Sequence, residues 1–225
     1  MNVAIVGYGK MGRMIEGLAP RHGIAVSHRL DIGWTEGDLA ERPDAAIEFS
    51  TPEAAVANLE KLGSLGIPVV CGTTGWFAEL DRVRATFERQ GVALVYSANY
   101  SIGVNVFQRL AAEAALLLKE DAQYEAWAWE IHHSAKKDAP SGTLLQITAA
   151  MRAAGYARRI DESSSRAGAH PGTHEIGFDS AADTITLRHT ARSREGFARG
   201  ALKAAAWIKG KRGVHPFADV LFGRV

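Results

Sequence analysis

The feature that most constrains this chain is a short apolar segment that runs directly into a glycine-rich turn. Residues 2–6 (NVAIV) are typical of a buried parallel strand, and the sequence GYGKMG at 7–12 predicts a tight turn followed by a short helix. Glycines at positions 7, 9 and 12 have the GxGxxG spacing, which lets backbone approach a pyrophosphate while helix N-terminal amides face its charge. The segment therefore predicts a nucleotide-binding strand, turn and helix.

The same alternation continues through the first hundred residues. Four further apolar runs predict strands, at 24–31, 45–50, 67–71 and 91–99. Amphipathic segments at 52–66 and 77–90 predict the intervening helices. Strands that alternate with helices in this way are typical of an α/β domain with a doubly wound, Rossmann-type parallel sheet.

The pattern changes after Ser101. A long amphipathic helix is expected at 102–120, a strand at 126–133, a helix at 143–155, a polar stretch at 160–175 and an antiparallel hairpin at 175–191. This region is expected to form a smaller α+β domain. We predict one domain from 1–103 with 196–225 and a second from 104–195, the final segment contributing one helix and a loop that pack back on the first domain.

Composition restricts the partners of the chain. Of its 225 residues 47% are hydrophobic, and 26 basic side chains against 25 acidic ones give a formal net charge of +1. Such a balance provides no field that would favour nucleic acid or an anionic membrane, so a small-molecule partner is expected. No apolar run approaches the about 20 residues of a membrane span. The single cysteine, Cys71, and the lack of a signal-peptide pattern predict a cytoplasmic location.

An acidic residue supports the interpretation of the first turn. Asp31 ends the second predicted strand, 19 positions after Gly12, where a carboxylate accepts hydrogen bonds from ribose hydroxyls. The turn GTTG at 72–75 also follows a buried strand and can line the same crevice. The alternative is that both turns are purely structural and Asp31 is a solvated strand end.

The sequence does not decide whether the cofactor carries a 2′-phosphate, which distinguishes NADPH from NADH. Asp31 would repel a 2′-phosphate and so favours NADH, whereas Lys10, Arg13 and Arg29 are near enough in sequence to accommodate NADPH. Either NADH or NADPH is therefore expected.

The densest chemistry lies in EIHHSAKKDAPSGT at 130–143. His132 and Lys136 are four residues apart, so on a helical turn they would share a face and offer two proton donors to one substrate. Pro140, Ser141 and Gly142 open the next helix, where free amides and the Ser141 and Thr143 hydroxyls could bind a carboxylate. Each piece alone could be structural, and no metal site is expected because a third ligand at recognisable spacing is missing.

This segment resembles the characteristic sequence of the dihydrodipicolinate reductase family, in which a glutamate, two histidines, a lysine and DAPSGT occur in the same order and spacing. Four other segments match that family in register: GYGKMG at 7–12, CGTTG at 71–75, SANYSIGVNVF at 97–107 and SREGFARGALKAAAWIKGK at 193–211. The resemblance spans nearly the whole chain. It implies NAD(P)H-dependent reduction of 4-hydroxy-tetrahydrodipicolinate, with loss of water, in the diaminopimelate route to lysine.

The resemblance also implies individual roles. His132 would be the catalytic acid or base, Lys136 a proton donor and His133 a substrate contact, while Ser141, Gly142 and Thr143 would hold a substrate carboxylate. The implied cofactor-binding residues are Gly7, Gly9, Lys10, Met11, Gly12, Asp31, Gly72, Thr73, Thr74, Ser97, Ala98, Asn99 and Tyr100. The second domain is implied to contain a mixed sheet and to form a homotetramer.

One departure from the family and two alternatives accompany this assignment. Ile32 stands where some relatives carry an arginine for the 2′-phosphate, and no physical argument fixes the roles of Arg194 and Phe197. A homoserine or semialdehyde dehydrogenase would share the two-domain layout but not the segment at 130–143. A sensor would bind NADH without consuming it, so turnover distinguishes it from an enzyme.

Overall fold

A computed structural model describes all 225 residues, which divide into two compact units. One unit contains Met1–Ser101 with Glu195–Val225, and the other contains Ile102–Arg194. These boundaries lie close to the predicted ones. Each unit has its own sheet and its own hydrophobic core.

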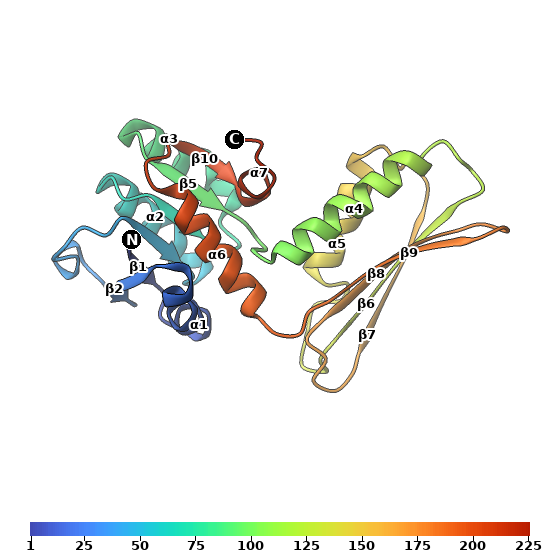
Figure 1. Cartoon of the computed structure of the whole chain (residues 1–225), viewed down its shortest axis with the longest axis horizontal. Coiled ribbons are helices and arrows are strands. Elements are labelled where there is room, and N and C mark those ends of the chain that lie inside the picture. Colours follow the sequence, from blue (N-terminus) through green and yellow to red (C-terminus); the bar gives the residue numbers. More distant parts are fainter. The chain divides into compact units, whose positions relative to one another are not determined.

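The first unit contains a six-stranded sheet in the order β10-β5-β4-β3-β1-β2, in which every paired neighbour is parallel (Figure 1). Its strands are β1 (Asn2–Val6), β2 (Ala25–Leu30), β3 (Ala45–Glu48), β4 (Val69–Cys71), β5 (Ala93–Tyr96) and β10 (Gly213–Pro216). Its helices are α1 (Lys10–Leu18), α2 (Pro52–Ser64), α3 (Leu80–Gln90), α6 (Glu195–Ile208) and α7 (Phe217–Leu221). Short 3₁₀ turns occupy Ala19–His22, Glu36–Asp38 and Phe77–Glu79.

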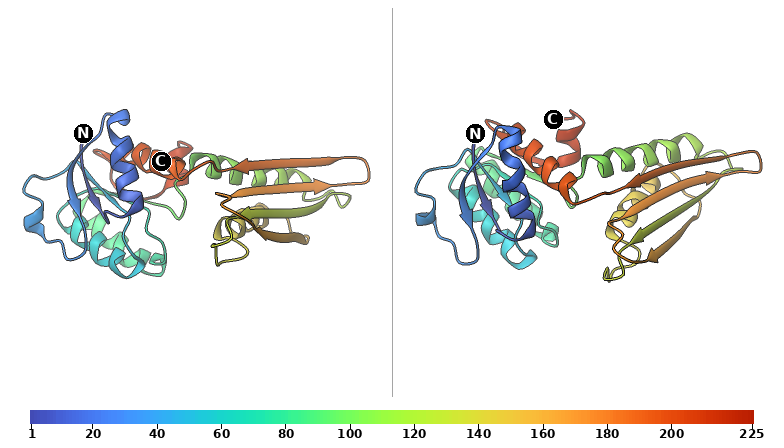
Figure 2. Two further views of the ribbon diagram at one scale, coloured as in Figure 1. Left: turned by 90° about the horizontal axis from the view of Figure 1, so that it is seen from below. Right: turned by 60° about the horizontal axis from the view of Figure 1, so that its bottom comes forward.

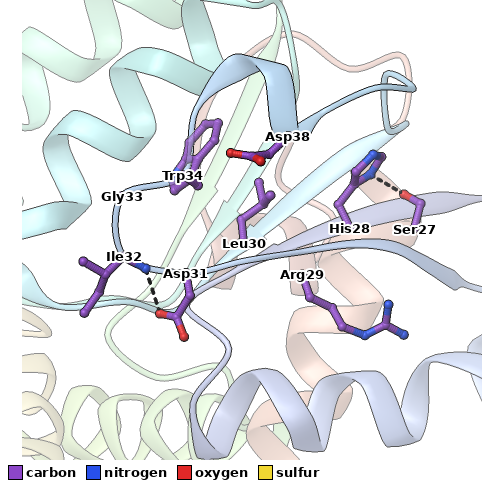
Figure 3. Close-up of a pocket in the computed structure, with 9 residues that line it drawn as sticks. All are labelled: Ser27, His28, Arg29, Leu30, Asp31, Ile32, Gly33, Trp34 and Asp38. Atoms are coloured by element: carbon purple, nitrogen blue, oxygen red, sulfur yellow. Dashed lines mark hydrogen bonds between the residues drawn. The ribbon is translucent and has the colours of Figure 1, made fainter.

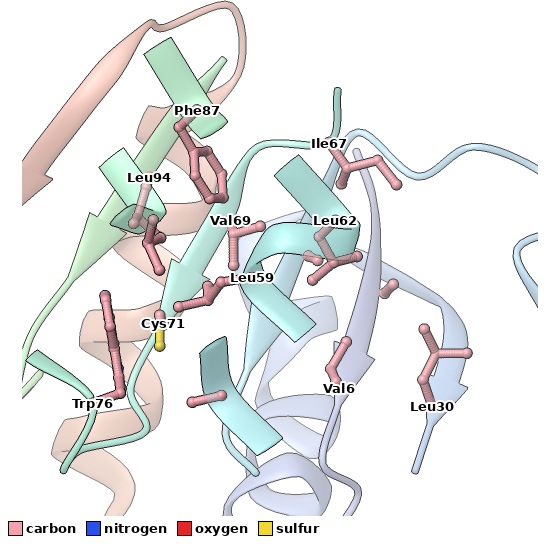
Figure 4. Close-up of a cluster of buried hydrophobic side chains, with 14 of the residues drawn as sticks. Val6, Leu30, Leu59, Leu62, Ile67, Val69, Cys71, Trp76, Phe87 and Leu94 are labelled. Carbon is pink, nitrogen blue, oxygen red and sulfur yellow. The ribbon is translucent and has the colours of Figure 1, made fainter. Parts of the chain in front are cut away.

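The continuous apolar character of the inner strands β1, β4 and β5 follows from their position. Helices α1 and α6 pack beside one another, as do α2 and α3, so both faces of the sheet are covered (Figure 1). Every residue of β3 and β4 is buried. On one face Leu59 and Leu62 of α2 meet Val69 and Phe87 in the main cluster of apolar side chains (Figure 4). A parallel sheet covered on both faces requires this pattern.

The second unit is built on a four-stranded mixed sheet in the order β7-β6-β8-β9. Its elements are α4 (Ile102–Leu118), β6 (Glu125–His132), α5 (Gly142–Ala153), β7 (Ile160–Arg166), β8 (Thr173–Asp179) and β9 (Thr184–Thr190). β6 pairs parallel with β7 and antiparallel with β8, which pairs antiparallel with β9. Figure 2 shows α4 and α5 on one face of this sheet.

The face under the two helices is apolar, and the opposite face has no helix. Ala126 and Ala128 of β6 lie opposite Phe178 and Ile176 of β8 and belong to the core with α4 and α5. The intervening residues of β6, including Trp127 and Trp129, are half-buried on the other face. Because successive side chains of a strand point to opposite faces, this sheet has one buried apolar face and one half-buried face.

Three local expectations were wrong. The polar stretch at 160–175 contains β7, an edge strand whose side chains are mostly exposed and therefore show no apolar run. The final segment contributes α6 as expected, but it also contributes α7 and the short strand β10, which extends the parallel sheet beside β5. No helix of the structure could span a membrane.

The third correction concerns the polar segment after β6. His132 ends that strand, and the residues from His133 to Ser141 form turns and loop. His132 and Lys136 therefore do not share a helical face. The path of the loop after β6, not a helical turn, determines where Lys136 lies relative to His132.

Candidate functional site

The glycine turn after β1 has two glycines that the fold requires and one that is open. Gly7 has φ +88, and a Cβ there would lie 2.2 Å from the carbonyl oxygen of Phe49. A Cβ on Gly12 would lie 2.6 Å from the carbonyl oxygen of Gly7, whereas one on Gly9 would meet nothing within 4 Å. Gly7 and Gly12 thus allow the strand, turn and helix to close, and Gly9 leaves space above the backbone.

A pocket of about 500 Å³ lies beside this turn, and it is lined by Gly7, Gly9 and Asp31 together with residues that follow β3. The sheet order places β1 between β2 and β3, so the chain reverses its winding direction at this point. Ligands of open α/β sheets bind outside the carboxyl ends of strands at such a reversal. The pocket therefore has the position expected of a nucleotide site.

A second pocket, of about 420 Å³, brings the two predicted turns together. Gly9, Lys10 and Met11 line it from one side, and Gly72 to Thr74 line it from the other. The Thr73 hydroxyl accepts a hydrogen bond from the Ser50 amide at 2.8 Å, which ties the turn after β4 to the loop after β3. The structure thus brings the predicted cofactor residues of both turns to one edge of the sheet.

Phe49 and Ser50 line both pockets and were not predicted. They follow β3, the strand that lies next to β1. Both were included in the strand predicted at 45–50, and their sequence, FS, has no glycine that would indicate a binding turn. The strand order is the signal that finds them, because it identifies which strand ends flank the glycine turn.

Figure 3 shows the residues that line a third pocket, of about 450 Å³, which shares Asp31 with the pocket beside the glycine turn. We call this third pocket the outer pocket. Arg29 and Asp31 leave β2 toward the same side, away from His28 and Trp34. The Asp31 carboxylate accepts the Ile32 amide at 3.0 Å and is otherwise exposed to solvent. Asp31 therefore lies at the boundary between the pocket beside the glycine turn and the outer pocket.

The segment Ser97 to Tyr100 is held by its own hydrogen bonds. The Ser97 hydroxyl donates to the carbonyl of Asn99 at 2.8 Å. Tyr100 is 1% exposed, and its hydroxyl lies 2.9 Å from the Val95 carbonyl and 3.0 Å from that of Cys71. Burial raises the pKa of Tyr100 well above its usual value. The Tyr100 side chain therefore stabilises the loop from inside, and a ligand could use the backbone.

The second unit contains a buried charge cluster at the end of β6. Glu130 is fully buried, and its carboxylate receives two hydrogen bonds from Arg166, at 2.8 and 3.0 Å. It also bonds Nδ1 of His132 and accepts the Ser141 amide at 3.2 Å. Burial opposes the charge on Glu130, but the bonds from Arg166 and His132 outweigh it and lower the pKa of Glu130 to about 2.

Glu130 determines how His132 is presented. With Nδ1 directed at the carboxylate, the other ring nitrogen, Nε2, points away toward Gly172. A Cβ on Gly172 would lie 2.8 Å from that nitrogen, so glycine keeps the space beside it clear. Burial lowers the pKa of His132, although the hydrogen bond to Glu130 opposes this effect. His132 is thus a fixed imidazole with one nitrogen available for proton exchange.

His174 lies next to His132 on the neighbouring strand. The two ring centroids are 5.2 Å apart, and Nε2 of His174 lies 3.1 Å from the Ser141 hydroxyl. Burial, followed by the nearby His132, lowers the pKa of His174 to about 4, so its ring is neutral at pH 7. Sequence reasoning did not single out His174 or Arg166, because each belongs to a strand distant from His132 in sequence.

The loop after His132 carries the remaining predicted residues. The Lys136 ammonium bonds Asp138 at 2.7 Å, and the same carboxylate lies 3.4 Å from the Gly142 amide. Ser141 begins α5 as predicted, but it is 1% exposed and its hydroxyl accepts the Leu144 amide at 3.2 Å. The Ser141 hydroxyl is therefore a helix cap, and the exposed Gly142 amide is better placed for a ligand.

A parallel sheet with a glycine-rich turn after its first strand, joined in one chain to a mixed sheet with a histidine at the end of β6 and a lysine in the next loop, is the layout of a two-domain nicotinamide-dependent oxidoreductase. Residues 1–100 match the family model described as Dihydrodipicolinate reductase, N-terminus, and residues 103–221 match Dihydrodipicolinate reductase, C-terminus. The chain belongs to the dihydrodipicolinate reductase family.

Individual relatives agree with this assignment. The 4-hydroxy-tetrahydrodipicolinate reductase of Christiangramia forsetii is 36% identical over 235 residues, which cover 98% of each chain. That of Methanoregula boonei is 39% identical over 197 residues, 81% of this chain and 76% of the relative. A dipicolinate-bound dihydrodipicolinate reductase from Paenisporosarcina sp. TG-14 has the same fold, with a TM-score of 0.82 at 19% identity over 96% and 97% of the two chains. The family and the fold predicted from the sequence are confirmed.

Proposed function

We propose that the protein reduces 4-hydroxy-tetrahydrodipicolinate to tetrahydrodipicolinate, with loss of water, at the expense of NADH or NADPH. The observation that carries this proposal is the cluster in which Glu130 fixes His132 beside the loop of Lys136, directly before the N-terminus of α5. The same activity is in the names of relatives that match nearly the whole chain. The reaction belongs to the diaminopimelate route of lysine biosynthesis.

The residues at the glycine turn fit a dinucleotide. The space above Gly9 would be filled by the pyrophosphate, and the first amides of α1 have no acidic side chain in the first turn to compete for them. Gly7, Gly12, Asp31 and the turn at Gly72 would complete the binding surface. When bound, the reduced nicotinamide supplies a hydride.

His132 and Lys136 would handle the proton that accompanies the hydride. Glu130 holds Nδ1, so Nε2 of His132 can accept a proton and return it. Lys136 carries a transferable proton on an ammonium group that Asp138 now holds at 2.7 Å. A substrate carboxylate could replace Asp138 as the partner of Lys136, which would place the proton donor against the ring.

The two substrate carboxylates would bind at the N-terminus of α5. The Gly142 amide and Thr143 lie at the positive end of this helix, and His133 lies in the loop that precedes it. The related protein from Paenisporosarcina binds dipicolinate, a dicarboxylate of the same size and charge. We therefore assign a small cyclic dicarboxylate as the substrate of this surface.

We also propose a homotetramer that forms through the mixed sheet. The face that carries Trp127 and Trp129 has no helix of its own chain, and the ring of Trp127 lies against Gly177 on the neighbouring strand. A half-buried aromatic surface of this kind is typical of an interface.

The cytoplasm is the proposed location, because the only cysteine, Cys71, is buried and unpaired.

Genetic complementation tests the proposed function. A bacterium that lacks its own reductase for this step, and therefore requires diaminopimelate, should grow without it when it expresses this chain. A chain with His132→Gln, expressed at the same level, should not restore growth. Failure of the wild-type chain, produced in folded form, would refute the proposed reaction.

A further inference from the structure

Asp31 lines both the pocket beside the glycine turn and the outer pocket. The charged side chains around these pockets determine whether the adenosine ribose of the cofactor can carry a 2′-phosphate. NADPH differs from NADH by a phosphate on the 2′-oxygen of this ribose, and that group requires cationic partners. The outer pocket presents two carboxylates, Asp31 and Asp38. Two hydrogen bonds from Thr35, through its amide and its hydroxyl, lower the pKa of Asp38 and keep it charged.

The only arginine that lines this pocket is already paired. The Arg29 guanidinium bonds Glu16 of α1, and the Tyr8 hydroxyl bonds the same carboxylate. These two bonds lower the pKa of Glu16, and the bond to Glu16 raises that of Arg29. Arg29 therefore faces the pocket with its charge compensated by an acid that sits outside the pocket lining.

Three other cations lie near the pocket in sequence or in space, and each has another partner or position. Lys61 donates to the Trp34 carbonyl at 2.9 Å and lies over the Trp34 ring. Arg13 lies over the Tyr8 ring, 5.8 Å from its centroid. Lys10 lines the pocket between the two turns and neither of the pockets that Asp31 lines. Beyond Asp31 the next side chain is Ile32, which is fully exposed and apolar. A purine could cover it, whereas a phosphate would gain nothing from it.

We propose that Glu16 is a specificity-determining residue, which makes this enzyme prefer NADH by engaging the Arg29 guanidinium that a 2′-phosphate would need as its partner. The inference rests on the proposed cofactor site. Asp31 repels the phosphate directly, and Glu16 acts through Arg29 as a positioning residue. Replacement of Glu16 by a neutral amide should leave Arg29 without its partner in a pocket whose other ionisable lining residues are His28, Asp31 and Asp38.

Equilibrium binding of NADH and of NADPH to the whole chain, followed by nicotinamide fluorescence, measures this effect without turnover. The wild type is expected to bind NADH about tenfold tighter than NADPH or more. Glu16→Gln should tighten NADPH binding about five- to tenfold and change NADH binding less than about twofold. Glu88→Gln is the matched control, because Glu88 also pairs with an arginine, Arg84 at 3.9 Å, on an exposed helix of the same unit. It should change neither value.

A second variant separates release of Arg29 from simple loss of a negative charge. Glu16→Gln combined with Arg29→Ala should return NADPH binding to the wild-type value. A gain that persists in the double variant, or equal binding of both cofactors by the wild type, would overturn the inference. Wild-type protein that binds neither cofactor would instead refute the proposed cofactor site.

Discussion

The two sheets of this protein differ in what covers them. In the parallel sheet β1, β3 and β4 are buried almost residue for residue, because helices of the same unit cover both faces. In the mixed sheet β6 alternates between buried and half-buried positions, and β9 is mostly exposed. The buried strands of the parallel sheet leave ligand binding to the loops at their carboxyl ends, whereas the mixed sheet also carries polar side chains, Glu130 and His132, on a strand.

The sites in the two units reflect this difference. The proposed cofactor site is made mainly of backbone, at the turns that begin with Gly7 and Gly72. The proposed substrate site is made of side chains, because Glu130 and His132 project from the end of β6, on the face that carries Ala126 and Ala128, beside His174 of β8. Substitutions should therefore separate binding of the nucleotide from chemistry on the substrate.

The largest effect is expected at His132. His132→Gln should lower turnover about 100-fold or more, because the variant cannot exchange a proton through Nε2. Lys136→Met should lower turnover to a similar degree. Affinity for NADH, measured by titration, should stay unchanged in both variants because the proposed nucleotide site lies in the other unit. Full activity of either variant would remove that residue from the catalytic assignment.

A charge on the uncovered face of the mixed sheet should have the next largest effect. Trp129→Lys would place an ammonium group in the proposed interface, where its desolvation costs several kcal/mol. Analytical ultracentrifugation should then detect smaller species in place of the tetramer, while NADH still binds. Trp129→Phe is the control and should remain tetrameric. A wild-type protein that sediments as a monomer would contradict the proposed assembly.

Two glycines of the first turn should respond differently to the same methyl group. Gly7→Ala should destabilise the protein by about 2–4 kcal/mol, because the residue has a positive φ and its Cβ would overlap the Phe49 carbonyl. Gly9→Ala should leave the free energy of unfolding nearly unchanged and weaken NADH binding. Urea unfolding and NADH titration of both variants give the two quantities. Equal stability of the two variants would show that the turn tolerates the clash.

Acid should affect the mixed-sheet unit, with the smallest change in the set. The pKa of His174 falls from 6.5 in the unfolded chain to about 4 in the fold, so between these values the unfolded chain binds more protons. Stability is thus fully present above about pH 6.5 and is lost as the pH falls toward 4. At about pH 5.5 the expected loss is about 1 kcal/mol. The low pKa of Glu130 adds a further loss below about pH 4.5.

Urea unfolding at about pH 7 and about pH 5.5, compared between wild type and His174→Gln, measures this contribution. The variant should lose less stability than the wild type over the same interval. An identical pH dependence in both proteins would show that His174 does not account for it.

Local patterns in the sequence predicted the parallel sheet well, because each buried strand is an uninterrupted apolar run. They missed β7 and β10, which are edge strands with few buried side chains and need no such run. The segment at 130–143 identified His132 and Lys136, but it could not identify Arg166. That residue reaches Glu130 only because β6 and β7 pair in parallel with His132 opposite Arg166. Contacts that depend on strand register cannot be found from local spacing.

The paired state of Arg29 could not be predicted for a similar reason. Its neighbours in sequence suggested a cation available to a phosphate, and the fold brings α1 alongside so that Glu16 reaches it. The Ser141 hydroxyl was likewise expected to face a ligand, and the structure shows that it caps α5. In both cases the residue type was informative, and the partner came from tertiary structure.

The central claim is that this chain oxidises a reduced nicotinamide only when its cyclic substrate is present. The most direct measurement follows the nicotinamide absorbance after purified protein is mixed with NADH, or NADPH, and substrate made in place from pyruvate and aspartate semialdehyde. The account predicts oxidation that depends on the substrate and is faster with NADH. Binding of NADH without any oxidation, in the presence of fresh substrate, would contradict it and would indicate a sensor or a different dehydrogenase.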